Sequence, residues 1–223
     1  MHESLKNVDL EYKDLALRFS RELDTELFND SQILLELCKV IFGIFLLIVA
    51  LFPLILVITL IVYISDGFPI VFKQSRIGKN GKPFDFYKFR TLKTSVNPYG
   101  DSPQSFNDSN IIKGGNILRA YSLDELPQLF NVLKGQMSLV GPRPLFKEHI
   151  KNLSKFHKQR LIVKPGLTGM SQINMRSDLL SKKSLDMEVE YVNSNSILLD
   201  MKIMLKTILV IISRKGVFNS TVD

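Results

Sequence analysis

Two adjacent carboxylates, Asp124 and Glu125, are the side chains of this sequence whose types and spacing best suit chemistry. Neighbouring side chains on a helix diverge by about 100°, so the two carboxylates suit different tasks rather than one shared atom. An ionised aspartate can attack phosphorus, and the second carboxylate can bind Mg²⁺, which neutralises phosphate charge. A solvated first turn of a helix, where the dipole favours acidic residues, is the simpler alternative.

A single arginine between two prolines, in the segment Gly141-Pro142-Arg143-Pro144, is the second candidate. Each proline fixes its own φ and restrains the residue before it, so the loop is rigid. A guanidinium held in this way presents a permanently charged fork that suits phosphate oxygens. A rigid loop with a surface arginine is the alternative interpretation.

Other basic residues accompany these motifs. Lys88 and Arg90 flank Phe89, and strand alternation places both cations on one face, as a phosphate site or as an ordinary exposed strand face. Arg119 lies five residues before Asp124. These cations are therefore candidates for binding phosphate near the two carboxylates.

The sequence offers little support for other kinds of site. His149 and His157 are eight residues apart without a third ligand at useful spacing, which indicates surface residues rather than a metal site. The P-loop, GxGxxG and GxSxG motifs are absent from the sequence. Cys38 is the single cysteine, so an internal disulfide framework is excluded.

The positive charge is unevenly divided along the chain of 223 residues. Residues 1–39 carry five basic and nine acidic side chains, whereas the remainder carries 24 basic and 13 acidic ones. Basic character thus belongs to the part after the N-terminal segment. Anionic lipid, phosphorylated substrates and nucleic acid would each suit it, and composition alone does not choose among them.

An uncharged run of 25 residues, 40–64, is long enough to enter a membrane. Its position and length argue against a cleaved signal peptide, and a buried core helix is the minor alternative. Pro53 lies in its middle and predicts a kink or a break, which leaves a kinked span and a re-entrant helix-break-helix both open. The basic segment that follows favours the cytoplasmic side.

The pattern after this run predicts a hairpin, a loop and several helices. Asn80-Gly81 is a strong hairpin-turn signal between two alternating runs within 68–90. Ser122 is expected to cap a helix beginning at Leu123, with Glu125 completing a capping box. The other expected elements are a loop over 92–116 and helices over 145–162, 183–192 and 197–213. We expect the last of these to lie in the membrane interface rather than pack on the domain.

Four stretches resemble a known family in their order and spacing: FKQSRIGKNGKPFDFYKFR, LRAYSLDELPQLFNVLKGQMSLVGPRP, KPGLTGMSQIN and LDMEVEYVNSNSILLDMKIMLKT. They are similar to bacterial sugar transferases, the monotopic polyprenyl-phosphate phosphoglycosyl transferases, over about residues 33–217. The resemblance implies an α+β, predominantly helical fold with a re-entrant helix broken near Phe52 and Pro53, a small β-hairpin and interfacial amphipathic helices.

The implied organisation has four parts. Residues 1–32 form an acidic helical extension, 33–66 the re-entrant membrane helix, 67–217 the cytoplasmic catalytic domain and 218–223 a tail. The implied location is the cytoplasmic face of the bacterial inner membrane. Anionic lipids are expected partners, a second copy of the chain and downstream glycosyltransferases are candidate partners, and nucleic acid is not required to explain the charge.

The resemblance also implies a reaction. A sugar phosphate passes from a UDP-sugar to undecaprenyl phosphate with release of UMP, as the first membrane step of surface polysaccharide or glycan synthesis. Asp124 matches the attacking aspartate, Glu125 the glutamate associated with Mg²⁺, and Arg143 the phosphate-contacting arginine. Lys88, Arg119 and Asp186 match polar positions around the site. A catalytically inactive scaffold that binds anionic lipid is the alternative.

Three positions depart from the family pattern. Phe52 replaces the serine that usually precedes the membrane proline, and Met170 replaces an aromatic residue. Asp108-Ser109-Asn110 stands where the family usually has Asp-Pro-Arg, which removes one arginine and bears on substrate choice. The two carboxylates are unaffected.

Overall fold

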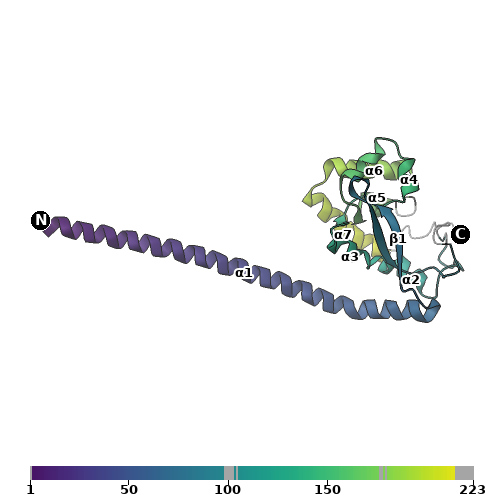
Figure 1. Cartoon of the computed structure of the whole chain (residues 1–223), viewed down its shortest axis with the longest axis horizontal. Coiled ribbons are helices and arrows are strands. Elements are labelled where there is room, and N and C mark those ends of the chain that lie inside the picture. The colour runs from purple at the N-terminus through teal and green to yellow at the C-terminus, as the bar shows by residue number, and fades with distance from the viewer. Residues whose placement is uncertain (1, 98–102, 104, 176–177, 179, 214–223) are drawn as a thin grey trace. The chain divides into compact units, whose positions relative to one another are not determined.

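The computed structural model describes residues 2–97, 103, 105–175, 178 and 180–213, without the side chains of 2–16, 19–31, 44–45 and 47–48. The chain divides into two compact units, Met1–Ile55 and Leu56–Asp223. Helix α1 (His2–Asp66) begins in the first unit and ends in the second (Figure 1). The later elements are β1 (Val71–Ile77), the 3-10 turn η1 (Lys79–Gly81), β2 (Pro83–Phe89), α2 (Gly115–Ala120), η2 (Leu123–Glu125), α3 (Gln128–Leu133), β3 (Ser138–Val140), α4 (Lys147–Lys151), η3 (His157–Ile162), β4 (Gly166–Thr168), α5 (Met170–Asn174), α6 (Lys182–Ser194) and α7 (Ile197–Ser213).

Helix α1 continues through Pro53, where the sequence predicted a break. Proline removes one backbone hydrogen bond, and the apolar helix-compatible residues on both sides keep the others. The predicted helix-break-helix is therefore not the structure of this segment, in which Phe52 and Pro53 are both exposed. Among the described residues, one helical window, Val49–Asp66, is long and apolar enough to cross a membrane. Re-entry into one face of a membrane stays a prediction.

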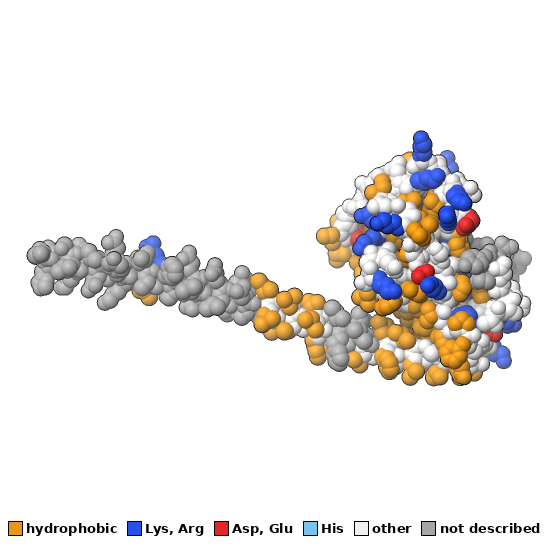
Figure 2. Space-filling model, viewed as in Figure 1, with side chains coloured by type: hydrophobic (Ala, Val, Ile, Leu, Met, Phe, Trp, Pro, Cys, Tyr) orange, Lys and Arg blue, Asp and Glu red, His pale blue; other side chains and the backbone are white. Residues whose placement is uncertain are grey.

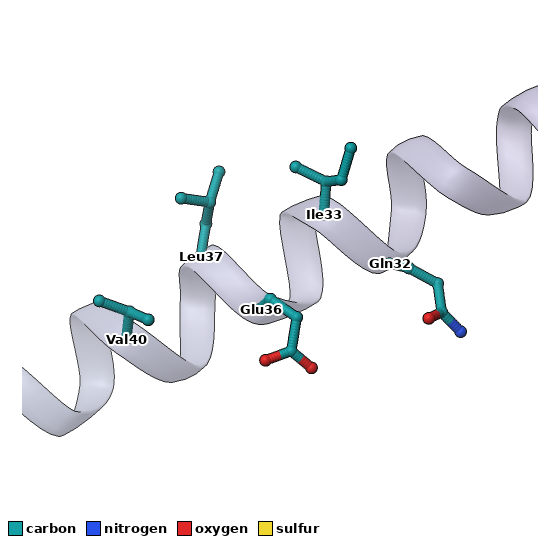
Figure 3. A pocket seen from close by; sticks show the side chains of 5 residues that line it. All are labelled: Gln32, Ile33, Glu36, Leu37 and Val40. Atoms are coloured by element: carbon teal, nitrogen blue, oxygen red, sulfur yellow. The ribbon is translucent and has the colours of Figure 1, made fainter. Parts of the chain in front are cut away.

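A shallow hollow on α1 carries no converging chemical groups. Its lining comes from one helix only, with Ile33, Leu37 and Val40 on one side and Gln32 and Glu36 on the other (Figure 3). All five side chains are exposed. The hollow is therefore an open helix surface rather than a binding site.

The predicted hairpin is confirmed. Strands β1 and β2 pair antiparallel from Val71↔Phe89 to Ile77↔Pro83. Asn80 and Gly81 adopt φ angles of 57° and 76°, the left-handed conformation that the turn requires. Phe84 and Phe86 are buried with Met137, and this core holds β2 in place. The face of β2 that carries Lys88 is thus fixed by packing.

The helix predicted to begin at Leu123 is replaced by two short pieces, η2 and α3, which follow the short helix α2. Ser122 has a φ of 54°, and its side chain makes no capping hydrogen bond, so the predicted capping box is wrong. A left-handed residue reverses the chain and cannot present its hydroxyl to the next turn as an extended N-cap does. Pro127 then stands immediately before α3. The reversal turns Asp124 inward instead of leaving it on an exposed first turn.

The C-terminal half joins a small parallel sheet to two longer helices. Strand β3 pairs with β4 through Ser138↔Gly166 and Val140↔Thr168. The helix predicted over 145–162 is interrupted and survives only as α4 and η3, whereas α6 and α7 confirm the last two predicted helices. The second unit is thus mixed and mostly helical with small sheets.

Helix α7 has one packed side and one exposed apolar side. Ile203 is buried with Val140 and Tyr191, and Met170 packs against this cluster. The exposed apolar residues of α7 are Ile197, Leu198, Met201, Leu205, Ile208, Leu209 and Ile212. The helix therefore packs on the domain as well as presenting an apolar surface. Lys and Arg side chains lie on the visible surface of the second unit (Figure 2).

Candidate active site

Asp124 and Glu125 lie in the short turn η2, between α2 and α3. Only 6% of Asp124 is exposed, so its interpretation as part of a solvated helix turn is wrong. Burial first and the charge of Glu125 second raise the pKa of Asp124 to about 6, although the nearby cations lower it. Asp124 is thus a buried carboxylate whose negative charge is incompletely compensated.

Three cations from separate segments surround this pair. Lys88 comes from β2, Arg119 from α2 and Arg143 from the loop after β3. Burial lowers the pKa of both Lys88 and Arg119, while Asp124 and Glu125 act on both in the opposite direction. Five of the predicted site residues are therefore brought together.

Arg143 makes the direct link to the carboxylate pair. Its Nη2 donates to Glu125 Oε1 over 2.9 Å, and the charge of Glu125 is the main reason that the pKa of Arg143 is raised. The side chains of Arg143 and Glu125 remain 28% and 18% exposed. A phosphate can therefore reach the guanidinium without the pair having to open fully.

The backbone of Arg143 is held from both sides. Its N–H donates to Glu188 Oε1 over 3.2 Å, and its carbonyl accepts a hydrogen bond from Arg160. Arg160 Nη2 lies 2.8 Å from Glu188 Oε2, and Ser171 Oγ donates to Glu188 Oε1 over 2.8 Å. Arg160, Glu188 and Ser171 are all buried. This network fixes the direction in which the Arg143 side chain leaves its loop.

Sequence reasoning missed Arg160 and Glu188, although Glu188 left a signal. It follows Leu185 by three residues and directly precedes Val189, and all three are buried on α6. A charged residue at an apolar position of a helix is buried only when it is paired. That position therefore predicts a buried partner, without saying that the partner is Arg160.

Arg76 is a third residue that the sequence did not single out. It donates to Pro144 O over 3.4 Å and to Gln74 Oε1 over 2.8 Å, and its guanidinium lies 3.4 Å from the centroid of the Phe146 ring. Burial, followed by repulsion from Arg143, lowers the pKa of Arg76 to about 9. Arg76 thus braces the loop at the proline that follows Arg143.

Three glycines let the Arg143 loop approach its neighbours by backbone alone. A Cβ atom on Gly166 would lie 2.1 Å from Gly141 N, and one on Gly169 would lie 2.2 Å from Gly141 O. One on Gly141 would lie 2.5 Å from Lys164 O. No side chain fits at these distances, so the glycines set how closely the loop approaches β4.

One family of known proteins matches most of this chain. A family model described as "Bacterial sugar transferase" matches residues 31–214. The chain belongs to this family. The match includes every residue of the buried cluster and both longer helices of the C-terminal half.

Individual relatives of this sugar transferase carry more specific names. The "Uncharacterized sugar transferase EpsL" of Bacillus subtilis (strain 168) is 40% identical over 157 residues, which cover 70% of this chain and 77% of EpsL. The "UDP-glucose:undecaprenyl-phosphate glucose-1-phosphate transferase" of Escherichia coli (strain K12) is 40% identical over 164 residues, or 70% of this chain and 35% of the relative. The "Exopolysaccharide production protein ExoY" of Sinorhizobium fredii (strain NBRC 101917 / NGR234) is 34% identical over 186 residues, which cover 77% of this chain and 82% of ExoY. The chain thus spans about a third of the E. coli protein's length.

Arg90 has a different place in this sugar transferase from the one predicted. Only 6% of it is exposed, and its ion pair is with Asp66 at the end of α1. Its Nε donates to Pro69 O over 2.6 Å, and its Nη2 donates to Asp66 O and Gly67 O over 2.9 and 2.5 Å. All three of its nitrogens are engaged. Arg90 is therefore a structural residue beside the site, and its contacts do not support the predicted role in substrate binding.

Asp186 makes a side-chain contact that the sequence did not predict. Its Oδ1 lies 2.8 Å from His157 Nε2, and His157 Nδ1 lies 3.2 Å from Ser154 Oγ. His157 is half-buried, so its interpretation as a surface residue is wrong. Asp186 is thus paired with His157, and its assignment to substrate binding stays a prediction.

The residues present fit Mg²⁺ only together with a substrate. Within the described part of the chain, no three His, Cys, Asp or Glu side chains form a metal-binding group. Asp124 and Glu125 offer two adjacent carboxylates. Proteins commonly hold Mg²⁺ by one or two carboxylates, water and substrate phosphates, so this donor set suits a metal that arrives with a diphosphate.

Proposed function

We propose that this protein transfers a sugar 1-phosphate from a UDP-sugar to undecaprenyl phosphate. The observation that carries the proposal is the buried Asp124 beside Glu125, surrounded by Lys88, Arg119 and Arg143. The printed name of the E. coli relative describes a reaction of this kind. Such a cluster suits phosphoryl transfer, in which positioned charges do most of the catalytic work.

The reaction proceeds in two displacements. An oxygen of the Asp124 carboxylate attacks the phosphorus next to the sugar, the bond to the UMP oxygen breaks, and UMP leaves with that electron pair. The sugar phosphate is then held on Asp124. An oxygen of undecaprenyl phosphate attacks the same phosphorus, releases the Asp124 carboxylate and forms undecaprenyl diphospho-sugar.

The three cations have different electrostatic roles. Arg143, oriented through its backbone, binds phosphate oxygens as a fork, while Lys88 and Arg119 offset the charge that develops on the phosphorus oxygens. Glu125 would hold Mg²⁺ together with the donor diphosphate, and the bound metal would further neutralise that charge. The pKa of Asp124 leaves its carboxylate ionised at neutral pH, as an attacking group requires.

The membrane supplies the acceptor. The apolar end of α1 enters the cytoplasmic face of the bacterial inner membrane, and the exposed apolar side of α7 lies in the interface. Basic side chains on the catalytic unit favour the anionic leaflet. The product begins a surface polysaccharide or glycan, and a second copy of the chain and downstream glycosyltransferases are candidate partners.

The test is UMP release in detergent with undecaprenyl phosphate, Mg²⁺ and a panel of UDP-glucose, UDP-galactose and UDP-N-acetylhexosamines. At least one donor should give UMP, and Asp124→Asn should abolish it, while Asp85→Asn, on the exposed side of β2, should not. Chelation with EDTA should stop the release, and Glu125→Gln should raise the Mg²⁺ concentration needed. Unchanged release by Asp124→Asn would remove the assigned nucleophile.

An inactive scaffold makes the opposite prediction. It would bind vesicles containing anionic lipid in a salt-sensitive way and release no UMP from any donor of the panel. Its motivation is the excess of basic residues after position 39. The burial of Asp124 among three cations favours the enzyme, because an exposed basic face alone would not require it.

A further inference from the structure

The C-terminal end of α1 is hydrogen-bonded to Arg90, which directly follows β2, the strand that carries Lys88. Besides the ion pair between Arg90 and Asp66, Arg90 donates to three carbonyls at and just after the end of the helix, those of Asp66, Gly67 and Pro69. Thr94 N donates to Asp66 Oδ2 over 2.8 Å. The last carbonyls of a helix have no partner within it, and here the buried guanidinium of Arg90 pairs with that of Asp66 and with two carbonyls just beyond the helix. We call Asp66 and Arg90 the junction pair.

A second set of contacts joins the same end of α1 to the residues just before α2. Ile58 and Val62 are buried at 1% and 0% exposure, and Ser65 Oγ donates to Lys113 O over 2.9 Å. A Cβ atom on Gly114 would lie 3.0 Å from Ile61 Cγ2, so the backbone of the α2 entrance touches the helix directly. The end of the apolar helix is therefore packed on the catalytic unit.

Both sets of contacts lie next to residues of the active site. Arg90 follows Lys88 by two positions, and Arg119 Nη1 lies 3.5 Å from Thr91 Oγ1. Thr91 O accepts a hydrogen bond from Ile112 N over 3.0 Å, which ties the end of β2 to the segment leading into α2. The contacts from the helix end to Lys88 and Arg119 are thus short and continuous.

We propose that the junction pair positions the active site for the lipid-borne acceptor. The inference rests on the proposed function. A UDP-sugar is soluble and reaches Asp124 from the aqueous side, but a lipid phosphate is confined to the membrane surface. Its phosphate reaches Asp124 only if Lys88 and Arg119 stand at the right height relative to the inserted end of α1. Strand β2 is held independently by pairing with β1, so loosening the junction leaves the donor step intact.

The experiment measures the two displacements separately. Without acceptor, the amount and rate of UMP released in the first turnover report the donor step and count the folded enzyme. With undecaprenyl phosphate in liposomes, steady-state turnover reports the acceptor step. The variants are Arg90→Lys and Asp66→Asn, the second of which leaves the carbonyl contacts of Arg90 in place. Lys73→Gln is the matched control, because it breaks the exposed Lys73–Asp85 pair (2.8 Å) on the same hairpin.

Arg90→Lys should keep its first-turnover UMP within about twofold of wild type and lose about tenfold or more in acceptor turnover, since small misplacements have large kinetic effects. Asp66→Asn should show a smaller loss of the same kind, and Lys73→Gln none. Presenting the acceptor in detergent micelles, where no bilayer fixes its height, should reduce the loss. Equal losses in both steps, or no loss in either, would overturn the inference while leaving the proposed function standing. A wild-type chain that releases no UMP would overturn both.

Discussion

The junction pair and the Asp124 cluster are both partly buried groups of charges, yet they are built differently. At the junction, every nitrogen of Arg90 has an acceptor, and Asp66 receives a backbone N–H as well. At Asp124, three cations face two carboxylates, and the pKa of the aspartate is still raised to about 6. A closed group of charges holds structure, whereas an incompletely compensated one keeps a reactive carboxylate available.

The largest effect should come from the buried pair that holds Arg143. Glu188→Leu leaves Arg160 buried without its counter-charge, which should lower the free energy of unfolding by about 3–5 kcal/mol. The double variant Glu188→Leu with Arg160→Met should recover most of that loss. Denaturant unfolding of wild type, Glu188→Leu and the double variant in one detergent measures the difference. A double variant no more stable than the single one would show that this pair is not a closed unit.

Arg143→Ala should lower kcat/KM for UMP release by about 10²–10³-fold, the usual effect of removing one fixed donor of transition-state charge. Arg143→Lys should recover only part of it, because an ammonium lacks the planar fork. In a Glu188→Gln background, the Arg143→Ala effect should be smaller, since the misdirected guanidinium already contributes less. Steady-state kinetics of these variants measure each effect. Fully additive losses would contradict the positioning of Arg143 by Glu188.

The pH dependence of the free energy of unfolding should reveal the incompletely compensated charge of Asp124. A carboxyl whose folded pKa is raised from 3.8 to about 6 binds more protons in the folded state between these values. Its stabilising effect is therefore present below about pH 4 and is lost as the pH rises through about 6. With EDTA present, Asp124→Asn should remove this dependence and be about 1–3 kcal/mol more stable than wild type at neutral pH. Equal pH profiles for the two proteins would contradict the uncompensated charge.

The smallest effect should follow from Lys73→Gln, which removes an exposed ion pair. Exposed pairs contribute about 1 kcal/mol or less, so stability and UMP release should both stay near wild type. Thermal unfolding and the UMP assay provide the check. A loss as large as that of Arg90→Lys would remove the distinction between a surface pair and the junction pair.

The sequence predicted the hairpin, α6, α7 and the residues that converge on Asp124. These succeed because Asn80-Gly81 is a local signal, apolar spacing persists along the helices, and the family resemblance names the motif residues. The predicted capping box at Ser122 is wrong because the left-handed backbone of Ser122 depends on packing around η2, which no local pattern encodes.

Arg90 and Arg160 show why charge assignments are harder. Strand alternation placed Arg90 beside Lys88, but the strand ends at Phe89 and the Arg90 side chain turns to the end of α1. Arg160 looks like one more cation in a lysine-rich segment, and only tertiary contact pairs it with Glu188. Partners distant in sequence decide whether a cation serves structure or substrate.

The central claim is that Asp124 carries the sugar phosphate, and trapping that species tests it most directly. The protein is incubated without acceptor with the active UDP-sugar carrying ³²P in the phosphate next to the sugar, then digested and analysed by mass spectrometry. We predict label on the peptide that contains Asp124, lost when undecaprenyl phosphate is added and absent from Asp124→Asn. Label on another residue, or its persistence in Asp124→Asn, would contradict the account.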